Sequence, residues 1–347
     1  MNCEFLIVGQ GLAGTLVGHA FEQIDRSFVV VDKVLPYSAS PVAAGIIHPV
    51  SGRRFVKAWN YDSLLPVFQN TYADMENKLG SNPLEHLEMR LNLSSVKEEN
   101  DLLSQAHRYG YADQLKLINE EDMVFECTKS CYSLPAFKLD IQSLVKLFRE
   151  RWTIQNKYFE EIMDYSHLRQ FNNKWHYRDI VADQVVFCEG CQSRFNPWFK
   201  YLPLVPNKGQ VFLLQKPDRY TLNKVIRHNL LFTEFNTSIW AGATYEWEFD
   251  SPCPDSTGWK FLSQKLTDIT KSPLEITAHL SGLRPTVTDR KPIIAHHPTF
   301  PNLWAINGFG TKGASIGPYV VNEFVGLIQG RLKTNLFAPD RLQKYLT

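Results

Sequence analysis

Glycine residues with a characteristic spacing lie near the start of the chain. Gly9, Gly11 and Gly14 form the pattern G-x-G-x-x-G, and Asp32 follows at the end of the next apolar run. Glycine permits the tight turn and the close backbone approach that a bound pyrophosphate requires. An acidic side chain after the second strand can accept hydrogen bonds from ribose hydroxyls. These residues therefore predict a dinucleotide site, but they do not distinguish NAD from FAD.

A second glycine-rich segment lies near the other end of the chain. Residues 307–318 read NGFGTKGASIGP and run directly into a helical pattern with Val321, Phe324 and Val325 on one face. The start of a helix presents unpaired N–H groups and a partial positive charge. Because Lys312 adds a full positive charge, this segment is a second candidate anion site.

Arginine residues occur in two segments without helix or strand periodicity. Arg284 lies in residues 281–292 (SGLRPTVTDRKP), which we expect to form a polar loop framed by prolines. Its planar guanidinium can pair with a carboxylate through two hydrogen bonds. An arginine that only braces the loop is the alternative. Arg53 and Arg54 end a segment of small residues, and either could hold a carboxylate or the edge of a flat ligand.

Hydrophobic periodicity predicts the elements that would position these residues. Residues 5–8 and 28–31 are apolar runs typical of buried strands, and an amphipathic helix links them. Further helices are predicted at 60–79, 97–109 and 139–152, and strands at 88–93 and 182–187. From residue 208 the period changes to about two, which predicts a mostly antiparallel sheet. Its strands are expected at 211–215, 230–234 and 238–245, followed by a helix at 260–269 and a strand at 303–306.

The composition is that of an ordinary globular protein, with 347 residues, 44% hydrophobic and 21% charged. The formal net charge of +1 gives no basic footprint, so a nucleic-acid partner is not expected. No apolar run approaches the ~20 residues that span a bilayer. Glu4 lies where a signal peptide would carry apolar residues. We therefore expect a cytoplasmic protein without a membrane partner.

The cysteines allow two functional interpretations and one structural one. Cys127 and Cys131, with Cys188 and Cys191, have a spacing that could form a four-thiolate zinc site. The last two could also form a redox-active pair. However, Cys188 ends an apolar run, where a small residue fills space at a strand end. We therefore expect no metal ion and no disulfide scaffold.

Four stretches of the sequence together resemble one family. They are LIVGQGLAG with Asp32, then NKGQVFLL, then AGATYEWEFD, and finally SGLRPTVTDRKPII followed by WAINGFGTKGASIGP. Along nearly its whole length the chain is similar to the D-amino-acid-oxidase-type family of FAD-dependent amine oxidoreductases. The resemblance implies an α/β fold: a Rossmann-like FAD-binding domain with an inserted, mostly antiparallel β-sheet substrate domain. The implied boundaries are 1–80, 139–200 and 282–347 for the FAD-binding domain, and 81–138 and 201–281 for the substrate-binding domain.

The resemblance also implies a non-covalent, extended FAD. Its adenine end would lie at residues 9–14, and its flavin ring between residues 43–49 and 308–316. His48 lies in the flavin segment and is expected to pack beside the ring rather than to be attached to it. The residues expected to contact FAD are Gly9, Gly11, Leu12, Ala13, Gly14, Asp32, Lys33, Ala43, Ala44, Gly45, Ile46, His48, Gly190, Gly308, Gly310, Thr311, Lys312, Gly313, Ala314 and Ser315.

Two relatives within the family suggest the reaction. Residues 282–285 (GLRP) resemble glycine oxidase, where the arginine pairs with the substrate carboxylate. Residues 43–54 and 308–318 resemble the oxidase domain of the bifunctional tRNA wobble-uridine modification enzyme. The resemblance implies oxidation of the CH–NH bond of a small amino acid or secondary amine by hydride transfer to flavin N5, giving an imine that hydrolyses. Arg284, Lys312 and Arg53 are the expected catalytic residues. A tRNA wobble-uridine side-chain-modifying flavoenzyme and a non-catalytic flavin-binding subunit are the alternatives.

Overall fold

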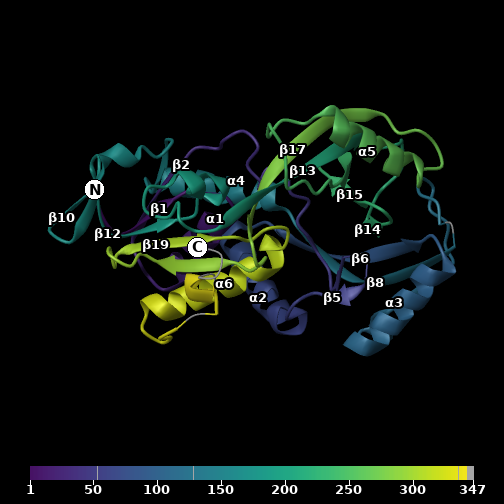
Figure 1. Ribbon diagram of the computed structural model, residues 1–347, viewed down its shortest axis with the longest axis horizontal. Coiled ribbons are helices and arrows are strands. Elements are labelled where there is room, and N and C mark those ends of the chain that lie inside the picture. Colours follow the sequence, from purple (N-terminus) through teal and green to yellow (C-terminus); the bar gives the residue numbers. More distant parts are fainter. Residues whose placement is uncertain (53, 128, 335, 342–347) are drawn as a thin grey trace.

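The computed structural model describes residues 1–52, 54–127, 129–334 and 336–341. Its strands form two large sheets and one small one, and in Figure 1 the first large sheet lies at the left and the second at the right. The small sheet pairs β4 (Val50–Ser51) with β5 (Val56–Lys57). The predicted α/β fold class is confirmed. The division into two domains stays a prediction.

The first sheet is built around the N-terminal strand. Its order is β10-β11-β12-β1-β2-β9, with β19 and β18 continuing beside the C-terminal part of β12. Strands β1, β2, β9, β12 and β19 are mutually parallel, so their carboxyl ends meet at one edge, where open α/β sheets bind ligands. The bounds are β1 (Asn2–Val8), β2 (Phe28–Asp32), β9 (Tyr158–Glu160), β10 (Leu168–Phe171), β11 (Lys174–Tyr177), β12 (Ile180–Phe187), β18 (Ile293–His296) and β19 (Leu303–Asn307).

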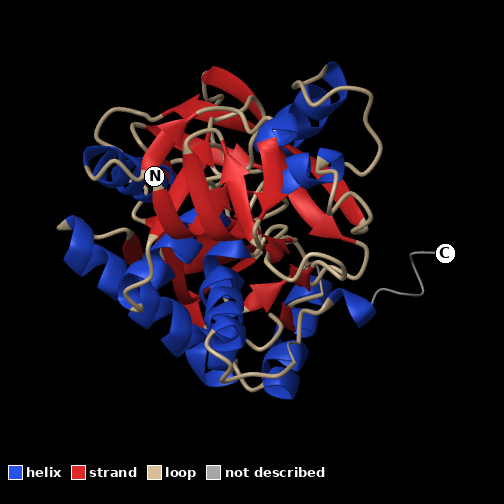
Figure 2. Cartoon of the chain, turned by 90° about the vertical axis from the view of Figure 1, so that its left-hand side faces the viewer, coloured by secondary structure: helices blue, strands red, loops and turns tan. Residues whose placement is uncertain are grey.

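Helices cover one face of this sheet. Phe5 and Ile7 of β1 pack into a core with four helices, while Leu6 and Val8 point into the core on the opposite face. Figure 2 shows several helices gathered beneath the strands. The four are α1 (Leu12–Gln23), α2 (Tyr61–Leu79), α4 (Ile141–Ile154) and α6 (Gly313–Ile328). The helices predicted at 60–79 and 139–152 are therefore confirmed.

The second sheet is mostly antiparallel, as predicted. Its order is β17-β13-β16-β15-β14-β6-β8-β3, with β7 beside β8, and only β14 and β6 run parallel. Its bounds are β3 (Ile46–Ile47), β6 (Leu84–Leu93), β7 (Lys116–Ile118), β8 (Ser130–Leu139), β13 (Leu204–Gln215), β14 (Lys224–Arg227), β15 (Leu231–Phe235), β16 (Ser238–Gly242) and β17 (Ile276–Val287). Helix α5 (Ser256–Thr267) packs on one face through Leu262 and Leu266. Helix α3 (Val96–Tyr109) packs beside β6 and β8 through Leu102 and Ala106.

The structure corrects one predicted element. Residues 281–287 were expected to belong to a loop, but they form the second half of β17, which pairs with β13 along almost its whole length. Pro285 stands opposite Pro206 in this ladder. Proline is tolerated here because β17 is the edge strand, where no further neighbour requires its missing N–H. Arg284 is consequently fixed on a strand.

Three short 3₁₀ helices complete the fold: Ala112–Gln114, Tyr165–His167 and Gly190–Phe195. The last of these follows β12 directly and brings Gly190 to the carboxyl edge of the first sheet. Among the described helices, none is long and apolar enough to cross a membrane.

Candidate active site

One large cavity receives residues from both glycine-rich segments and from both large sheets. Its volume is about 1610 Å³, which exceeds the roughly 300–1,000 Å³ of ordinary small-molecule pockets. Residues 8–13, 31–48 and 309–315 all line it, as does Arg284. Segments about three hundred residues apart in the sequence therefore enclose a single space.

Close packing fixes the first glycine turn. Gly9 has φ +95°, and a Cβ added there would lie 2.6 Å from the carbonyl oxygen of Cys188. A Cβ on Gly14 would lie 1.9 Å from the carbonyl oxygen of Gly9. Gly14 does not line the cavity; its role is to let α1 approach the turn. The Ser40 hydroxyl accepts a hydrogen bond from the Leu12 N–H at 3.1 Å and so holds the adjacent loop against the start of α1.

Asp32 lies at the carboxyl end of β2, beside a positive charge. Its carboxylate pairs with Arg149 of α4 at 3.2 Å, and Tyr158 donates to its backbone oxygen at 2.9 Å. Burial raises the pKa of Asp32, against the opposing effects of the Gln10 backbone and Arg149. Arg149 also donates to the side chain of Gln10 at 2.8 Å. This cluster fixes the orientation of the Asp32 carboxylate, and its contact with a ribose stays a prediction.

The second glycine-rich turn leads into α6. Lys312 occupies the N-cap position and lines the cavity, and burial lowers its pKa. In the part of the chain that the structure describes, the N–H groups of Gly313 and Ala314 have no hydrogen-bond partner. Tyr72 of α2 donates to the Ala314 carbonyl oxygen at 2.6 Å and fixes this end of the helix. The lysine and the helix N-terminus lie together at the cavity, and that they bind an anion stays a prediction.

His48 lies between these two turns, and its ring has both a lowered pKa and a nitrogen without a hydrogen-bond partner among the described residues. Burial, together with the positive charges of Arg227 and Lys312, lowers its pKa to about 3, so its ring is neutral at physiological pH. Its Nδ1 is buried and has no partner among the described residues. The neighbouring Gly45 has φ +67°, and a Cβ there would lie 1.8 Å from the carbonyl oxygen of Leu139. The segment is thus held close to β8, and His48 lines the cavity.

Arg284 projects into the cavity from β17. Its Nη1 donates to the Asn207 side chain at 2.6 Å and to the Thr244 carbonyl oxygen at 3.1 Å. Its guanidinium lies over the Tyr245 ring at 5.3 Å. A Cβ on Gly209 would lie 2.1 Å from its Nη2, so only glycine leaves room for the guanidinium. Within the described residues Nη2 and Nε have no hydrogen-bond partner, and this side of the guanidinium can meet a carboxylate.

Most of the residues predicted to contact FAD line this cavity. They are Gly9, Gly11, Leu12, Ala13, Asp32, Lys33, Ala43, Ala44, Gly45, Ile46, His48, Gly190, Gly310, Thr311, Lys312, Gly313, Ala314 and Ser315. Gly14 and Gly308 lie behind its wall; a Cβ on Gly308 would meet Val287 at 2.5 Å. Arg53 lies outside the described residues. Arg54 is exposed and does not line the cavity.

Sequence reasoning missed three charged residues of the site: Arg149, Arg227 and Glu189. Each lines the cavity, and each has its role only through partners distant in sequence. Glu189 accepts hydrogen bonds from Tyr165 at 2.5 Å and from Asn196 at 2.8 Å. Burial raises the pKa of Glu189 to about 7. For Glu189 the strand end at Phe187 was an available signal, because the carboxyl ends of parallel strands meet at the ligand edge.

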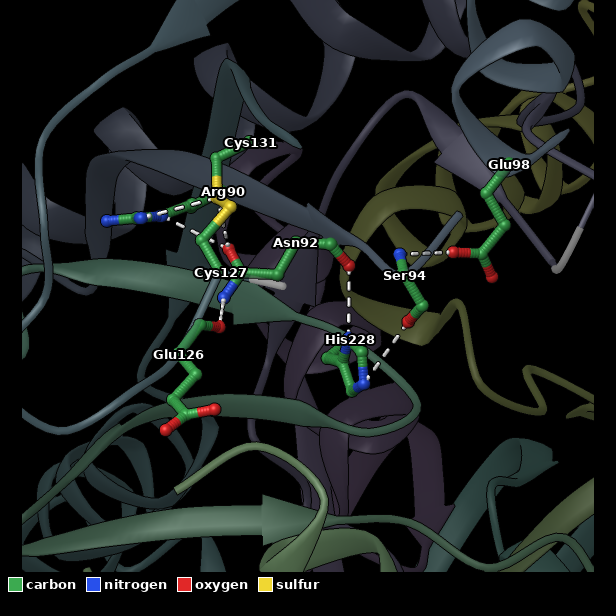
Figure 3. The surroundings of a disulfide bond; sticks show 8 residues. All are labelled: Arg90, Asn92, Ser94, Glu98, Glu126, Cys127, Cys131 and His228. Atoms are coloured by element: carbon green, nitrogen blue, oxygen red, sulfur yellow. Dashed lines mark hydrogen bonds between the residues drawn. A yellow bond between two sulfur atoms is a disulfide. The ribbon is translucent and has the colours of Figure 1, made fainter. Parts of the chain in front are cut away.

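The cysteines do not form the zinc site considered from the sequence. Cys127 and Cys131 are joined by a disulfide, as Figure 3 shows, so their thiolates are not free to bind a metal ion. Cys188 and Cys191 are free thiols, and burial raises their pKa values. Among the described residues no group of three or more His, Cys, Asp or Glu side chains could hold a metal ion. The disulfide was not expected from the sequence.

Residues 4–322 match the family model described as FAD dependent oxidoreductase. The chain belongs to this family. As an FAD-dependent oxidoreductase it confirms the predicted enzyme class, the predicted family and the predicted cofactor.

Solved structures of similar fold extend the comparison. Iminodiacetate oxidase (IdaA) from Chelativorans sp. BNC1 is 18% identical with a TM-score of 0.79, and the match covers 97% of this chain and 99% of that one. Glycine oxidase from Geobacillus kaustophilus is 16% identical with a TM-score of 0.79, covering 97% of each chain. L-proline dehydrogenase from P. horikoshii is 16% identical with a TM-score of 0.76, covering 99% and 98%. At such identities the likeness shows a shared fold.

The cavity fits an FAD molecule. It reaches from Asp32 to Lys312, and at each end it meets the N-terminus of a helix. Among the described residues, the N–H groups of Ala13 in α1 and of Gly313 and Ala314 in α6 have no hydrogen-bond partner. His48, whose buried Nδ1 has no hydrogen-bond partner among the described residues, lines the cavity between those ends. A dinucleotide with an anionic pyrophosphate and a polar ring edge matches this set of groups.

Proposed function

We propose that this FAD-dependent oxidoreductase oxidises the CH–NH bond of a small amino acid or secondary amine that carries a carboxylate. The observation that supports this most is Arg284, whose guanidinium is braced on one side and open to the cavity on the other. The likeness to oxidases and dehydrogenases of amino and imino acids agrees with it.

Arg284 would pair with the carboxylate through Nη2 and Nε. Asn207 and the Thr244 carbonyl already hold Nη1, so the guanidinium plane is set before the substrate arrives, and little freedom is lost on binding. A planar fork that is fixed in this way also orients the carbon next to the carboxylate.

Few other protein groups are needed for this reaction. When bound, FAD would supply the acceptor for a hydride from the substrate carbon; the substrate nitrogen would lose a proton, and water would hydrolyse the imine product. Lys312 and the unpaired N–H groups of Gly313 and Ala314 would stabilise negative charge that develops at the end of the cavity they line. The His48 ring is neutral because it is buried, so it adds no positive charge beside that of Lys312.

Anaerobic mixing of the FAD-loaded protein with amino acids and secondary amines tests the proposal without knowledge of the electron acceptor. We expect loss of flavin absorbance with an amine that carries a carboxylate, and at least tenfold slower reduction when that carboxylate is esterified. No reduction by any member of the panel would contradict an amine-oxidising function.

Substitution of Arg284 tests its role in the same assay. Arg284→Ala is expected to slow reduction at low substrate concentration by about tenfold to a hundredfold, because a charge-assisted hydrogen bond contributes about 1.5–3 kcal/mol. Exposed Arg54, which does not line the cavity, provides the control: Arg54→Ala should reduce at the wild-type rate. A loss of stability alone in Arg284→Ala would show that the residue only braces β13 and β17.

A further inference from the structure

A second arginine faces the cavity from the same side of the second sheet. The ladder aligns Arg227 with Leu231, then Gly242, Val211 and finally Leu280. Arg284 lies four residues beyond Leu280 on β17, so it shares that face. Arg227 and Arg284 thus lie at opposite ends of the sheet face that lines the cavity, which we call the roof. Small and apolar residues lie between them. The roof residues between them that line the cavity are Gly209, Val211, Leu231, Trp240, Gly242 and Gly282.

Arg227 is held in place but not neutralised. Its Nη2 donates to the Gly52 carbonyl oxygen at 2.5 Å, and its guanidinium lies over the Phe55 ring at 5.1 Å. Among the described residues, its buried Nη1 has no hydrogen-bond partner and no carboxylate lies within ion-pair distance of its guanidinium. A buried cation without a counter-ion is costly, and an anionic ligand would remove that cost.

The surroundings of Arg227 suit an incoming anion. His48 lies close enough to Arg227 for that positive charge to lower its pKa, and the neutral ring adds no negative charge that would oppose an anion. Glu98, an acid whose charge acts on Arg227, accepts a hydrogen bond from the Ser94 N–H at 2.7 Å, as Figure 3 shows beside His228. Exposed Ser94 and Asn229 line the cavity, so this end reaches the surface.

The two arginines are too far apart to hold one carboxylate. Four inter-strand steps of about 4.8 Å separate β14 from β17, and four residues along β17 add about 13 Å, which puts the two backbones roughly 23 Å apart. Both side chains extend toward the cavity from these positions. A ligand that meets both must therefore be elongated, with a neutral middle.

We propose that Arg227 forms a second anion subsite, which holds a second carboxylate at the far end of an elongated amino-acid substrate. This deepens the function proposed above and rests on it, because Arg284 supplies the first contact. The substrate class becomes an amine with one carboxylate beside the reacting carbon and another at the opposite end.

Calorimetric titration of the FAD-loaded protein tests this without turnover. The probes are suberate and sebacate, each compared with its own monomethyl ester, which has the same length and one charge fewer. We expect at least one diacid to bind tenfold or more tightly than its ester. Equal binding of diacid and ester at both lengths would overturn the proposal.

Arg227→Gln assigns the effect to the residue. It should remove the advantage of the diacid while changing the affinity for the ester by no more than about twofold. Arg227→Lys, which keeps the charge, should retain part of that advantage and gives a reading if the glutamine variant unfolds. Equal weakening of diacid and ester in both variants would overturn the proposal.

Arg284→Gln separates this inference from the function on which it rests. This variant should lower the binding affinity for the ester as well as for the diacid. If it changes neither while Arg227→Gln still removes the diacid advantage, the carboxylate role of Arg284 fails and the anion subsite at Arg227 stands.

Discussion

The two glycine-rich turns both lead into a helix at the same cavity, yet they are built differently. At the start of α1 the glycines are confined by backbone: added Cβ atoms would meet carbonyl oxygens at 2.6 Å for Gly9 and 1.9 Å for Gly14. At the start of α6 Gly310 has more room, with its nearest neighbour at 3.8 Å, and Lys312 brings a full charge. Helix α1 has no charged residue of either sign in its first turn.

This difference indicates that the two turns hold a ligand in different ways. The first turn depends on shape, because a chain that passes so close to Cys188 and α1 leaves a fixed surface for a ligand. The second depends on charge, because a lysine and two unpaired N–H groups act together on an anion. Changes in packing should therefore damage the first turn most, and changes in charge the second.

The largest expected effect is that of Gly14→Ala. The new methyl group would strike the backbone of Gly9, which cannot move without shifting β1 from α1. We expect the free energy of unfolding to fall by about 3 kcal/mol or more, with loss of bound FAD. Denaturant unfolding and the flavin absorbance of the purified protein measure both.

Gly282→Ala is the matched control for this change. Its added Cβ would meet neighbours only at 3.5 Å, in extended backbone. The free energy of unfolding should change by less than about 1 kcal/mol. Similar losses in the two variants would show that the close contact at Gly14 has no special importance.

A pH effect is expected beside the first turn, at Glu189. Burial raises the pKa of Glu189 to about 7 from the 4.5 of a free glutamate. As pH rises from about 4.5 to 7, the unfolded chain ionises this residue while the folded chain keeps it protonated, so the folded state loses stability. The loss is at most about 3 kcal/mol and is complete above pH 7.

Unfolding of Glu189→Gln across this pH range measures that contribution. The variant should show a smaller decline between about pH 4.5 and 7 than the wild type. Glu160→Gln, at an exposed carboxylate on β9, should leave the wild-type decline unchanged. A parallel decline in Glu189→Gln and wild type would contradict the raised pKa.

The smallest effect is expected from charge at the second turn. Lys312→Met should lower the reduction potential of the bound flavin by about 30 mV, since this equals about 1.4 kcal/mol for a two-electron couple. Lys33→Met removes an exposed lysine that lines the cavity near the first turn, and it should shift the potential less. Equal shifts in the reduction potential would mean that the lysines at the two ends of the cavity affect the flavin to the same extent.

The sequence predicted the first turn well because its chemistry is local. The glycine spacing, the flanking strands and the cap of α4 by Asp140, which accepts from the Ser143 N–H at 3.0 Å, all depend on neighbours within a few residues. The same spacing could not show that Gly308 serves packing against Val287 rather than a ligand. A glycine indicates that another group lies close to the backbone, but it does not show whether that group belongs to the protein or to a ligand.

The roof of the cavity was harder to predict. Pro285 and the polar residues around it hid the edge strand that carries Arg284, because strand pairing there depends on β13, far away in the sequence. Arg227 and Arg149 carried no local signal, since one is anchored on Gly52 and the other on Asp32, 117 residues away. Contacts between residues far apart in the sequence determine the positions of these two arginines, and a hydrophobic pattern does not predict such contacts.

A crystal structure of the FAD complex would show directly how the cavity holds the cofactor. We expect one non-covalent FAD, with its adenine end at Gly9 and Asp32 and its flavin ring beside His48 and Lys312, below Arg284. A ring at the Asp32 end, or a flavin covalently attached to His48, would contradict it.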